Sequence, residues 1–188
     1  LKDKFPANAF LMRGFSAKPR IISMQSKYKL ESAAIAAYPM YRGIASLLGF
    51  SILPSADSIE ELFEIYRENY NKYDYFYIHI KGTDKTGEDG DFSGKVRCIE
   101  KVDNALPVLF DCMPDVLCIT GDHSSPALMH SHSWHPVPVL IHGKFCGYDR
   151  CQRFTEQDCI LGGLGTFESK YLMGQLLANA GRLKKFGA

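Results

Sequence analysis

Short apolar segments alternate with amphipathic segments of helical period along most of the chain, and this alternation limits the folds available to it. Residues 75–80, 116–120 and 137–141 are largely apolar and rich in aromatic or β-branched side chains, as buried strands are. Residues 58–72 and 95–110 carry apolar side chains at helical spacing. Strands that alternate with helices predict an α/β fold, with a mostly parallel sheet and helices on both faces.

Weaker patterns complete the expected order of elements. Ser58 and Glu61 have the spacing of a capping box at the start of a helix. The remaining expectations are a strand over 20–24, helices over 31–37, 41–48 and 167–180, and a glycine-rich loop over 81–94.

The composition is that of an ordinary globular domain. Of the 188 residues, 46% are hydrophobic and 23% are charged, and the net charge is +1. These values exclude a disordered chain, and the mixed charges do not form the basic stripe of a nucleic-acid binder. No apolar run approaches the ~20 residues that span a bilayer. The six cysteines include no CxxC pair and no signal peptide is visible, so we expect a cytoplasmic protein.

Carboxylates and imidazoles gather directly after the predicted strands, where parallel sheets bind their ligands. Four of the six histidines fall between residues 123 and 135. Oxygen and nitrogen ligands of this kind suit Mn²⁺, Mg²⁺ or Zn²⁺. The candidate ligands are Asp84, Glu88, Asp122, His123, His130, His132 and His135. The competing interpretation is that the aspartates are turn or cap residues and the histidines are loop residues.

Other polar residues are open to two interpretations. Lys81, Arg13 and Arg42 suit phosphate or carboxylate binding, but each also fits an ordinary surface position. His79 lies inside an apolar strand, where a hydrogen-bonded core histidine is the simpler interpretation. No serine or cysteine has the sequence context of an activated nucleophile, and the chain contains no P-loop and no GxSxG motif.

An ordered set of motifs is similar to one known family. Residues 120–123 read TGDH, residues 81–90 form a glycine-rich segment that contains Asp84, and His132 precedes the Pro-Val-Pro of residues 136–138. In this order the motifs resemble those of the archaeal-type, cofactor-independent phosphoglycerate mutases, which belong to the alkaline-phosphatase-like metalloenzymes. Residues 11–14 and the C-terminal residues 181–188 are similar as well.

The resemblance implies a three-layer α/β/α sheet of the alkaline-phosphatase type, present here in part. Residues 21–188 would form the C-terminal part of the metal-binding domain, and residues 1–20 a linker or the end of an inserted domain. Two divalent metal ions are implied, with Asp84 and His132 at one and Asp122 and His123 at the other. The implied substrate-binding residues are Arg13, Lys81 and Arg42, the last at a position where the family more often has lysine.

The chain departs from the family pattern in two ways. Glu88 stands where the family usually has a histidine ligand, and a glutamate would favour Mn²⁺ or Mg²⁺ over Zn²⁺. The family's nucleophilic serine and a further metal-binding aspartate have no counterpart before Asp84, and full-length members are about twice as long. We therefore expect the C-terminal part of such an enzyme, which alone is inactive and works with the N-terminal part of the same protein.

The implied activity is the interconversion of 3-phosphoglycerate and 2-phosphoglycerate through a phosphoserine, a step of glycolysis and gluconeogenesis. Three alternatives stay open. The chain could belong to another phosphomutase or phosphatase of the same superfamily, or to a divergent, metal-poor homologue without activity. It could also be a metal-dependent hydrolase that holds all its ligands in these 188 residues.

Overall fold

The computed structural model describes residue 6, residues 11–12 and residues 14–184. Its strands form two sheets. In the first, β1 (Ser32–Ala36) lies between β2 (Ser51–Ile52) and β3 (Tyr75–His79), and both pairings are parallel. In the second, β4 (Val116–Thr120) and β5 (Val139–Gly143) are antiparallel. The predicted α/β class with a parallel sheet is therefore confirmed, while the strand expected over 137–141 begins two residues later and runs antiparallel to β4.

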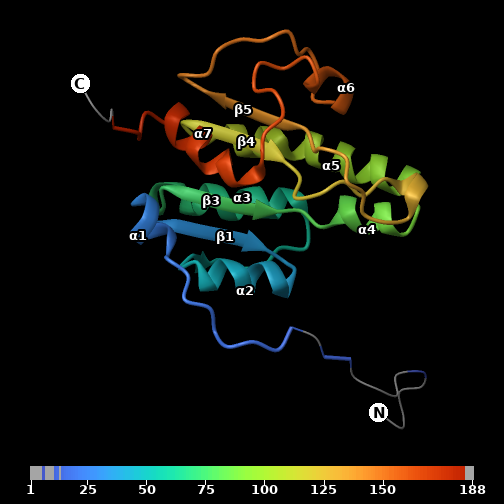
Figure 1. The fold of residues 1–188 in the computed structure, drawn as a ribbon, viewed down its shortest axis with the longest axis horizontal. Helices are drawn as coiled ribbons and strands as arrows, with labels where there is room; N and C mark the ends of the chain where they lie inside the picture. The colour runs from blue at the N-terminus through green and yellow to red at the C-terminus, as the bar shows by residue number, and fades with distance from the viewer. Residues whose placement is uncertain (1–5, 7–10, 13, 185–188) are drawn as a thin grey trace.

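Helices lie on both sides of the strands (Figure 1). The α5 helix passes behind β4 and β5, and α7 lies in front of β4, which it contacts. The α2 helix contacts β1 and β2. The described helices are α1 (Met24–Tyr28), α2 (Pro39–Leu47), α3 (Ile59–Asn69), α4 (Gly82–Glu88), α5 (Phe92–Phe110), α6 (Glu156–Cys159) and α7 (Leu172–Asn179). Short 3-10 turns lie at Tyr70–Lys72, Ala127–Met129 and Ser169–Tyr171.

The core forms where β1 meets the two long helices. Ile35 of β1 is fully buried against α3 and α5, which pack on each other. Phe63 and Tyr66 come from α3, and Ala105 and Leu109 come from α5. Burying a side chain of the size of leucine, isoleucine or phenylalanine stabilises the fold by roughly 1.5–3 kcal/mol. Apolar residues of β3 and β4 pack around the same cluster, so the two sheets share one helical layer.

The strongest sequence patterns are confirmed. The α3 helix begins after Ser58, whose side chain accepts a hydrogen bond from the Glu61 amide, as the capping motif predicts. The Glu61 carboxylate in turn accepts from the amide of Asp57, one residue before the expected position. The strands β3 and β4 and the helix α5 lie where the apolar periodicity places them.

Three local predictions are wrong. The alanine-rich segment 31–37 contains the strand β1, because pairing with β2 and β3 buries every one of its residues and outweighs the helix propensity of alanine. The strand expected over 20–24 is absent from the described residues there, and α1 begins at Met24 behind a capping Ser23. The segment 81–94 is mostly helical, because packing overrides the low helix propensity of its glycines.

The described part of residues 1–20 contains no helix or strand. Its assignment as a linker or the end of an inserted domain stays a prediction. The six cysteines are free thiols.

Candidate metal centre

Two strand ends bring the candidate ligands together. The chain leaves β3 at His79 and enters α4, which carries Asp84 and Glu88 on consecutive turns. It leaves β4 at Thr120 and reaches Asp122 and His123 within three residues. Because short, stiff connections follow both strands, little chain entropy is lost in holding these side chains in place.

A hairpin-like loop then brings His132 next to His123. The amide of Ser133 donates to the carbonyl of Ser124 at 2.9 Å, which forms an isolated antiparallel bridge. The bridge folds residues 124–133 back so that the rings of His123 and His132 lie with centroids 3.9 Å apart. The sequence alone gives no sign of this bridge.

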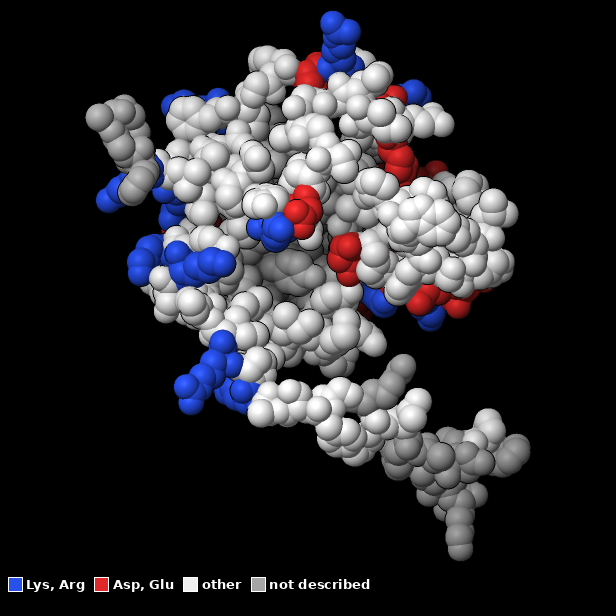
Figure 2. All heavy atoms as spheres, in the orientation of Figure 1, with Lys and Arg blue, Asp and Glu red and all other residues white. Residues whose placement is uncertain are grey.

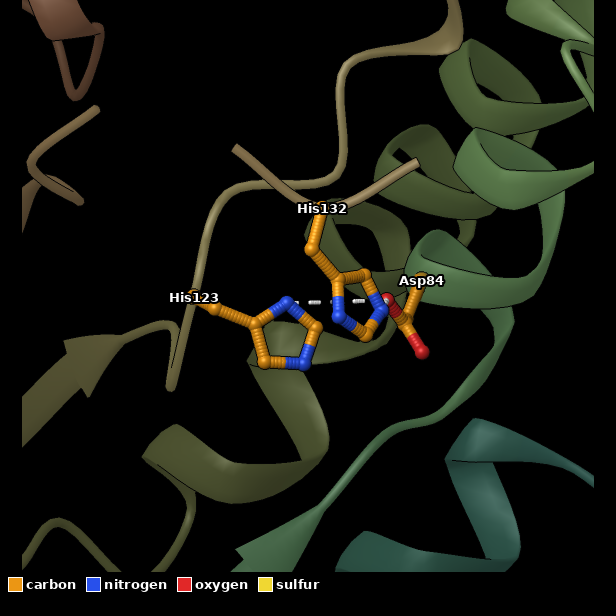
Figure 3. A group of neighbouring side chains, drawn as sticks. All are labelled: Asp84, His123 and His132. Atoms are coloured by element: carbon orange, nitrogen blue, oxygen red, sulfur yellow. Dashed lines mark ion pairs between the residues drawn. The ribbon is translucent and has the colours of Figure 1, made fainter. Parts of the chain in front are cut away.

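Asp84, His123 and His132 form a group whose ligand atoms all lie within 4.8 Å of one another. Figure 3 shows the two imidazoles and the carboxylate pointing toward one another from α4 and the two loops. Nε2 of His132 lies 3.4 Å from Oδ1 of Asp84 and 3.2 Å from Oε1 of Glu88. Nδ1 of His123 lies 3.7 Å from Oδ1 of Asp84.

Asp122 adjoins this group on the other side of His123. Its Oδ2 lies 3.6 Å from Nε2 of His123 and accepts a 2.7 Å hydrogen bond from the Tyr41 hydroxyl of α2. Burial acts to raise the pKa of Asp122, but the Tyr41 hydrogen bond and the nearby His123 outweigh it and hold the pKa below its usual value. The same hydrogen bond raises the pKa of Tyr41, so the phenol stays protonated as the donor.

Asp84 is held as a carboxylate by its neighbours. Its side chain is only 14% exposed, and burial acts to raise its pKa. Hydrogen bonds from Lys81 and from the Ser125 hydroxyl outweigh burial and lower the pKa below its usual value. The partnership in turn raises the pKa of Lys81, so the ammonium and the carboxylate form an ion pair.

The donor set fits a divalent cation. Carboxylate oxygens and imidazole nitrogens are the usual ligands of Mn²⁺, Mg²⁺ and Zn²⁺ in proteins. Here an ionised carboxylate and two imidazoles converge, with Glu88 and Asp122 at the edges of the group. Asp and Glu side chains lie mainly on the α4 side of the face in Figure 2, which favours cation uptake there.

The remaining candidates lie apart from this group. One guanidinium nitrogen of Arg42 donates to the carbonyls of Ala36 and Leu53, where β1 and β2 end. Arg13 falls outside the described residues. His130 packs over Gly90, and His135 is exposed with Nδ1 2.9 Å from the Ser133 hydroxyl.

His79 differs from its prediction as a hydrogen-bonded core histidine. Its Nδ1 is buried and has no hydrogen-bond partner within the described part of the chain. The ring packs against that of Tyr41 at a centroid distance of 3.9 Å and an interplanar angle of 32°, and burial lowers the pKa of His79. Through this contact β3 supports the tyrosine that reaches Asp122.

A family model describing the metalloenzyme superfamily matches residues 4–178. The chain belongs to the metalloenzyme superfamily. The metalloenzyme superfamily that the ordered motifs indicate is thereby confirmed, and so is the partial alkaline-phosphatase-like fold. The family also explains why metal-binding residue types converge at these strand ends.

Curated relatives in this superfamily match the chain over its whole length. A protein of Thermosipho melanesiensis is 48% identical over 188 residues, which are 100% of this chain and 47% of that protein. A protein of Thermus thermophilus is 49% identical over 191 residues, again 100% of this chain and 47% of that protein. Both are named probable 2,3-bisphosphoglycerate-independent phosphoglycerate mutases. The chain therefore spans about half the length of these relatives.

Solved structures share the fold. A Pyrococcus horikoshii protein aligns with a TM-score of 0.88 and 29% identity, over 94% of this chain and 57% of that one. The cofactor-independent phosphoglycerate mutase of Thermoplasma acidophilum aligns with a TM-score of 0.66 and 23% identity, over 86% of this chain and 39% of that one.

None of the described helices has the length and apolar character that a membrane span needs.

Proposed function

We propose that the chain is the C-terminal part of a metal-dependent phosphoglycerate mutase that interconverts 3-phosphoglycerate and 2-phosphoglycerate. The observation that carries the proposal is the convergence of Asp84, His123 and His132 in a chain 48% identical to a relative named a probable 2,3-bisphosphoglycerate-independent phosphoglycerate mutase. A glycolytic role in the cytoplasm follows from this activity.

Two cations would be held by neighbouring residues. Asp84, His132 and Glu88 form one set, with contacts of 3.2 Å and 3.4 Å, and Asp122 and His123 form the other, 3.6 Å apart. When bound, the cations would lower the pKa of a serine nucleophile and neutralise charge on the phosphoryl oxygens. Glu88 adds a hard anionic ligand, which supports Mn²⁺ or Mg²⁺ over Zn²⁺.

The residues of this chain would bind and orient the substrate around that centre. Lys81 lies just after β3 and beside Asp84, where its ammonium would bind the phosphate or carboxylate of the phosphoglycerate. Arg42 and Arg13 are proposed to contribute guanidinium groups, of which Arg42 already fixes the ends of β1 and β2. The nucleophilic serine is proposed to come from the N-terminal part of the protein.

Unpaired strand edges support such an N-terminal partner. Within the described residues, one edge of β3 and one edge of β4 have no strand beside them, although both strands are largely apolar and only half-buried. The two sheets nevertheless share the helical layer of α3 and α5. A further segment packed between these edges would bury them and complete one sheet.

The proposal is tested by assaying mutase activity with 3-phosphoglycerate and Mn²⁺. The full-length polypeptide that contains this chain is expected to be active and to lose roughly 100-fold or more in kcat when Asp84→Asn removes a ligand. The 188-residue chain alone is expected to be inactive. Full-length protein that binds Mn²⁺ but hydrolyses phosphate monoesters without forming 2-phosphoglycerate would assign a phosphatase instead.

A further inference from the structure

Ser125 lies between the two proposed ligand sets. It is one of two buried polar residues within the described part of the chain, with 4% of its surface exposed. Its hydroxyl donates to Oδ1 of Asp84 and also lies 3.2 Å from Nδ1 of His123. One side chain therefore contacts a ligand of each set.

The direction of these hydrogen bonds follows from proton counting. A serine hydroxyl has one proton to donate and lone pairs to accept with. The Asp84 carboxylate forms an ion pair with the Lys81 ammonium, so it only accepts hydrogen bonds. The Ser125 proton then points to Asp84, and its oxygen is left to accept from Nδ1 of His123.

A proton on Nδ1 decides what the other nitrogen of His123 can do. A neutral imidazole carries one proton, so Nε2 keeps a free lone pair. Nε2 is the nitrogen that lies 3.6 Å from Oδ2 of Asp122. The alternative tautomer would free Nδ1 instead and place His123 with Asp84 and His132, 3.7 Å from the Asp84 carboxylate.

We propose that Ser125 is a positioning residue that holds His123 in the Nδ1-protonated tautomer, so that Nε2 joins Asp122 in one ligand set and Asp84 stays with His132 in the other. The inference rests on the proposed metal centre and adds a residue that keeps its two ligand sets apart. Partners of this kind, one shell away from the ligands, commonly fix the tautomer and ring orientation of a metal-binding histidine.

Packing holds Ser125 in this position. Nζ of Lys95, on α5, donates to the Ser125 carbonyl at 2.6 Å. On the other side, α4 approaches so closely that a Cβ on Gly87 would lie 2.1 Å from the same carbonyl oxygen. The hydroxyl is therefore presented to Asp84 and His123 by two helices.

The tautomer is measured directly by ¹⁵N NMR of the imidazole nitrogens in the metal-free chain at about pH 8, above the usual histidine pKa of ~6.5. The His123 signals are assigned by their loss in His123→Ala. We expect Nδ1–H in the wild type, a loss of this preference in Ser125→Ala, and no change in Ser124→Ala, whose hydroxyl donates instead to the His135 carbonyl. An Nε2–H tautomer in the wild type, or an unchanged tautomer in Ser125→Ala, overturns the inference.

Titration with Mn²⁺ supplies the second readout. Ser125→Ala is expected to weaken binding by about 10- to 100-fold, as for other partners of metal ligands, and Ser124→Ala to leave it unchanged. Equal affinity of wild type and Ser125→Ala contradicts the positioning role. A wild-type chain that takes up no Mn²⁺ overturns the proposed metal centre instead, whereas the tautomer is decided by spectra recorded without metal.

Discussion

Tyr41 donates a 2.7 Å hydrogen bond to Oδ2 of Asp122, across 81 residues of sequence. The phenol comes from α2 and its ring packs against His79 at the end of β3. The carboxylate follows β4. This contact links the two sheets at the edge where the candidate metal ligands meet.

Removing the Tyr41 hydroxyl should loosen Asp122 without disturbing the contact between the Tyr41 and His79 rings. Tyr41→Phe is expected to weaken Mn²⁺ binding about 10-fold, because a partner that orients the ligand is lost. The loss of one hydrogen bond should cost about 1 kcal/mol of the free energy of unfolding. Calorimetric titration and urea denaturation measure the two effects. Tyr148→Phe, on a fully exposed tyrosine, should change neither, and unaltered affinity in Tyr41→Phe would count against the link.

Gly87 should tolerate no side chain. Gly87→Ala would place a Cβ 2.1 Å from the Ser125 carbonyl oxygen, so α4 must move away from the loop that carries His123. We expect a loss of about 1–3 kcal/mol in unfolding free energy together with weaker Mn²⁺ binding. The matched control is Gly43→Ala in α2, where a Cβ has open space and should be neutral or stabilising by up to ~1 kcal/mol. Similar melting temperatures for both variants would show that the close approach is unimportant.

Asp74 should make stability depend on acid pH. Its carboxylate accepts from the Glu31 amide at 2.9 Å and from Arg182 at 2.8 Å, and these contacts lower its pKa in the folded chain. The stabilisation is therefore complete above the unfolded pKa of ~3.9 and is lost as the pH falls through the lower, folded value. Because the side chain is 35% exposed, we expect only about 0.5–1 kcal/mol.

Urea denaturation between about pH 7 and pH 3 measures this dependence. Asp74→Asn should lower stability at neutral pH and bring the variant closer to the wild type as the solution is acidified. Asp111→Asn serves as the control, because the Asp111 carboxylate is 67% exposed and its ion pair with Arg67 is long, at 3.8 Å. Parallel pH curves for the wild type and Asp74→Asn would refute the assignment.

Glu88 should set the preference among metals. Glu88→His replaces the carboxylate that lies 3.2 Å from His132 by an imidazole, which suits Zn²⁺ better than a glutamate does. We expect the ratio of Zn²⁺ to Mn²⁺ affinity to rise about 10-fold or more. Competition titrations of the wild type, Glu88→His and the neighbouring exposed variant Asp89→His measure this ratio. A ratio that moves equally in both variants would place Glu88 outside the centre.

The sequence predicted the parts of the site that depend on local pattern. Asp84 and Asp122 follow apolar strands, and strand ends of a parallel sheet meet at one edge, so their proximity could be expected from periodicity alone. The return of His132 depends on a bridge between Ser124 and Ser133, and the Tyr41 contact spans 81 residues. Neither arrangement leaves a local signal in the sequence.

The wrong predictions of secondary structure have the same origin. The alanines of residues 31–37 predict a helix, but burial between two partner strands decides the structure of residues 32–36. The glycines of residues 81–94 predict a loop, whereas residues 82–88 form α4 and Gly87 is needed for the close approach of this helix to Ser125. In both places tertiary packing outweighed local propensity.

The most direct test of the metal centre is a calorimetric titration of the chain with Mn²⁺, beside Asp122→Asn, His132→Ala and the control His135→Ala. We predict saturable binding by the wild type and the control, and binding weakened at least about 10-fold by the other two variants. Binding that Asp122→Asn and His132→Ala leave unchanged, or no binding by any of the four proteins, would contradict a metal centre built from Asp84, His123 and their neighbours.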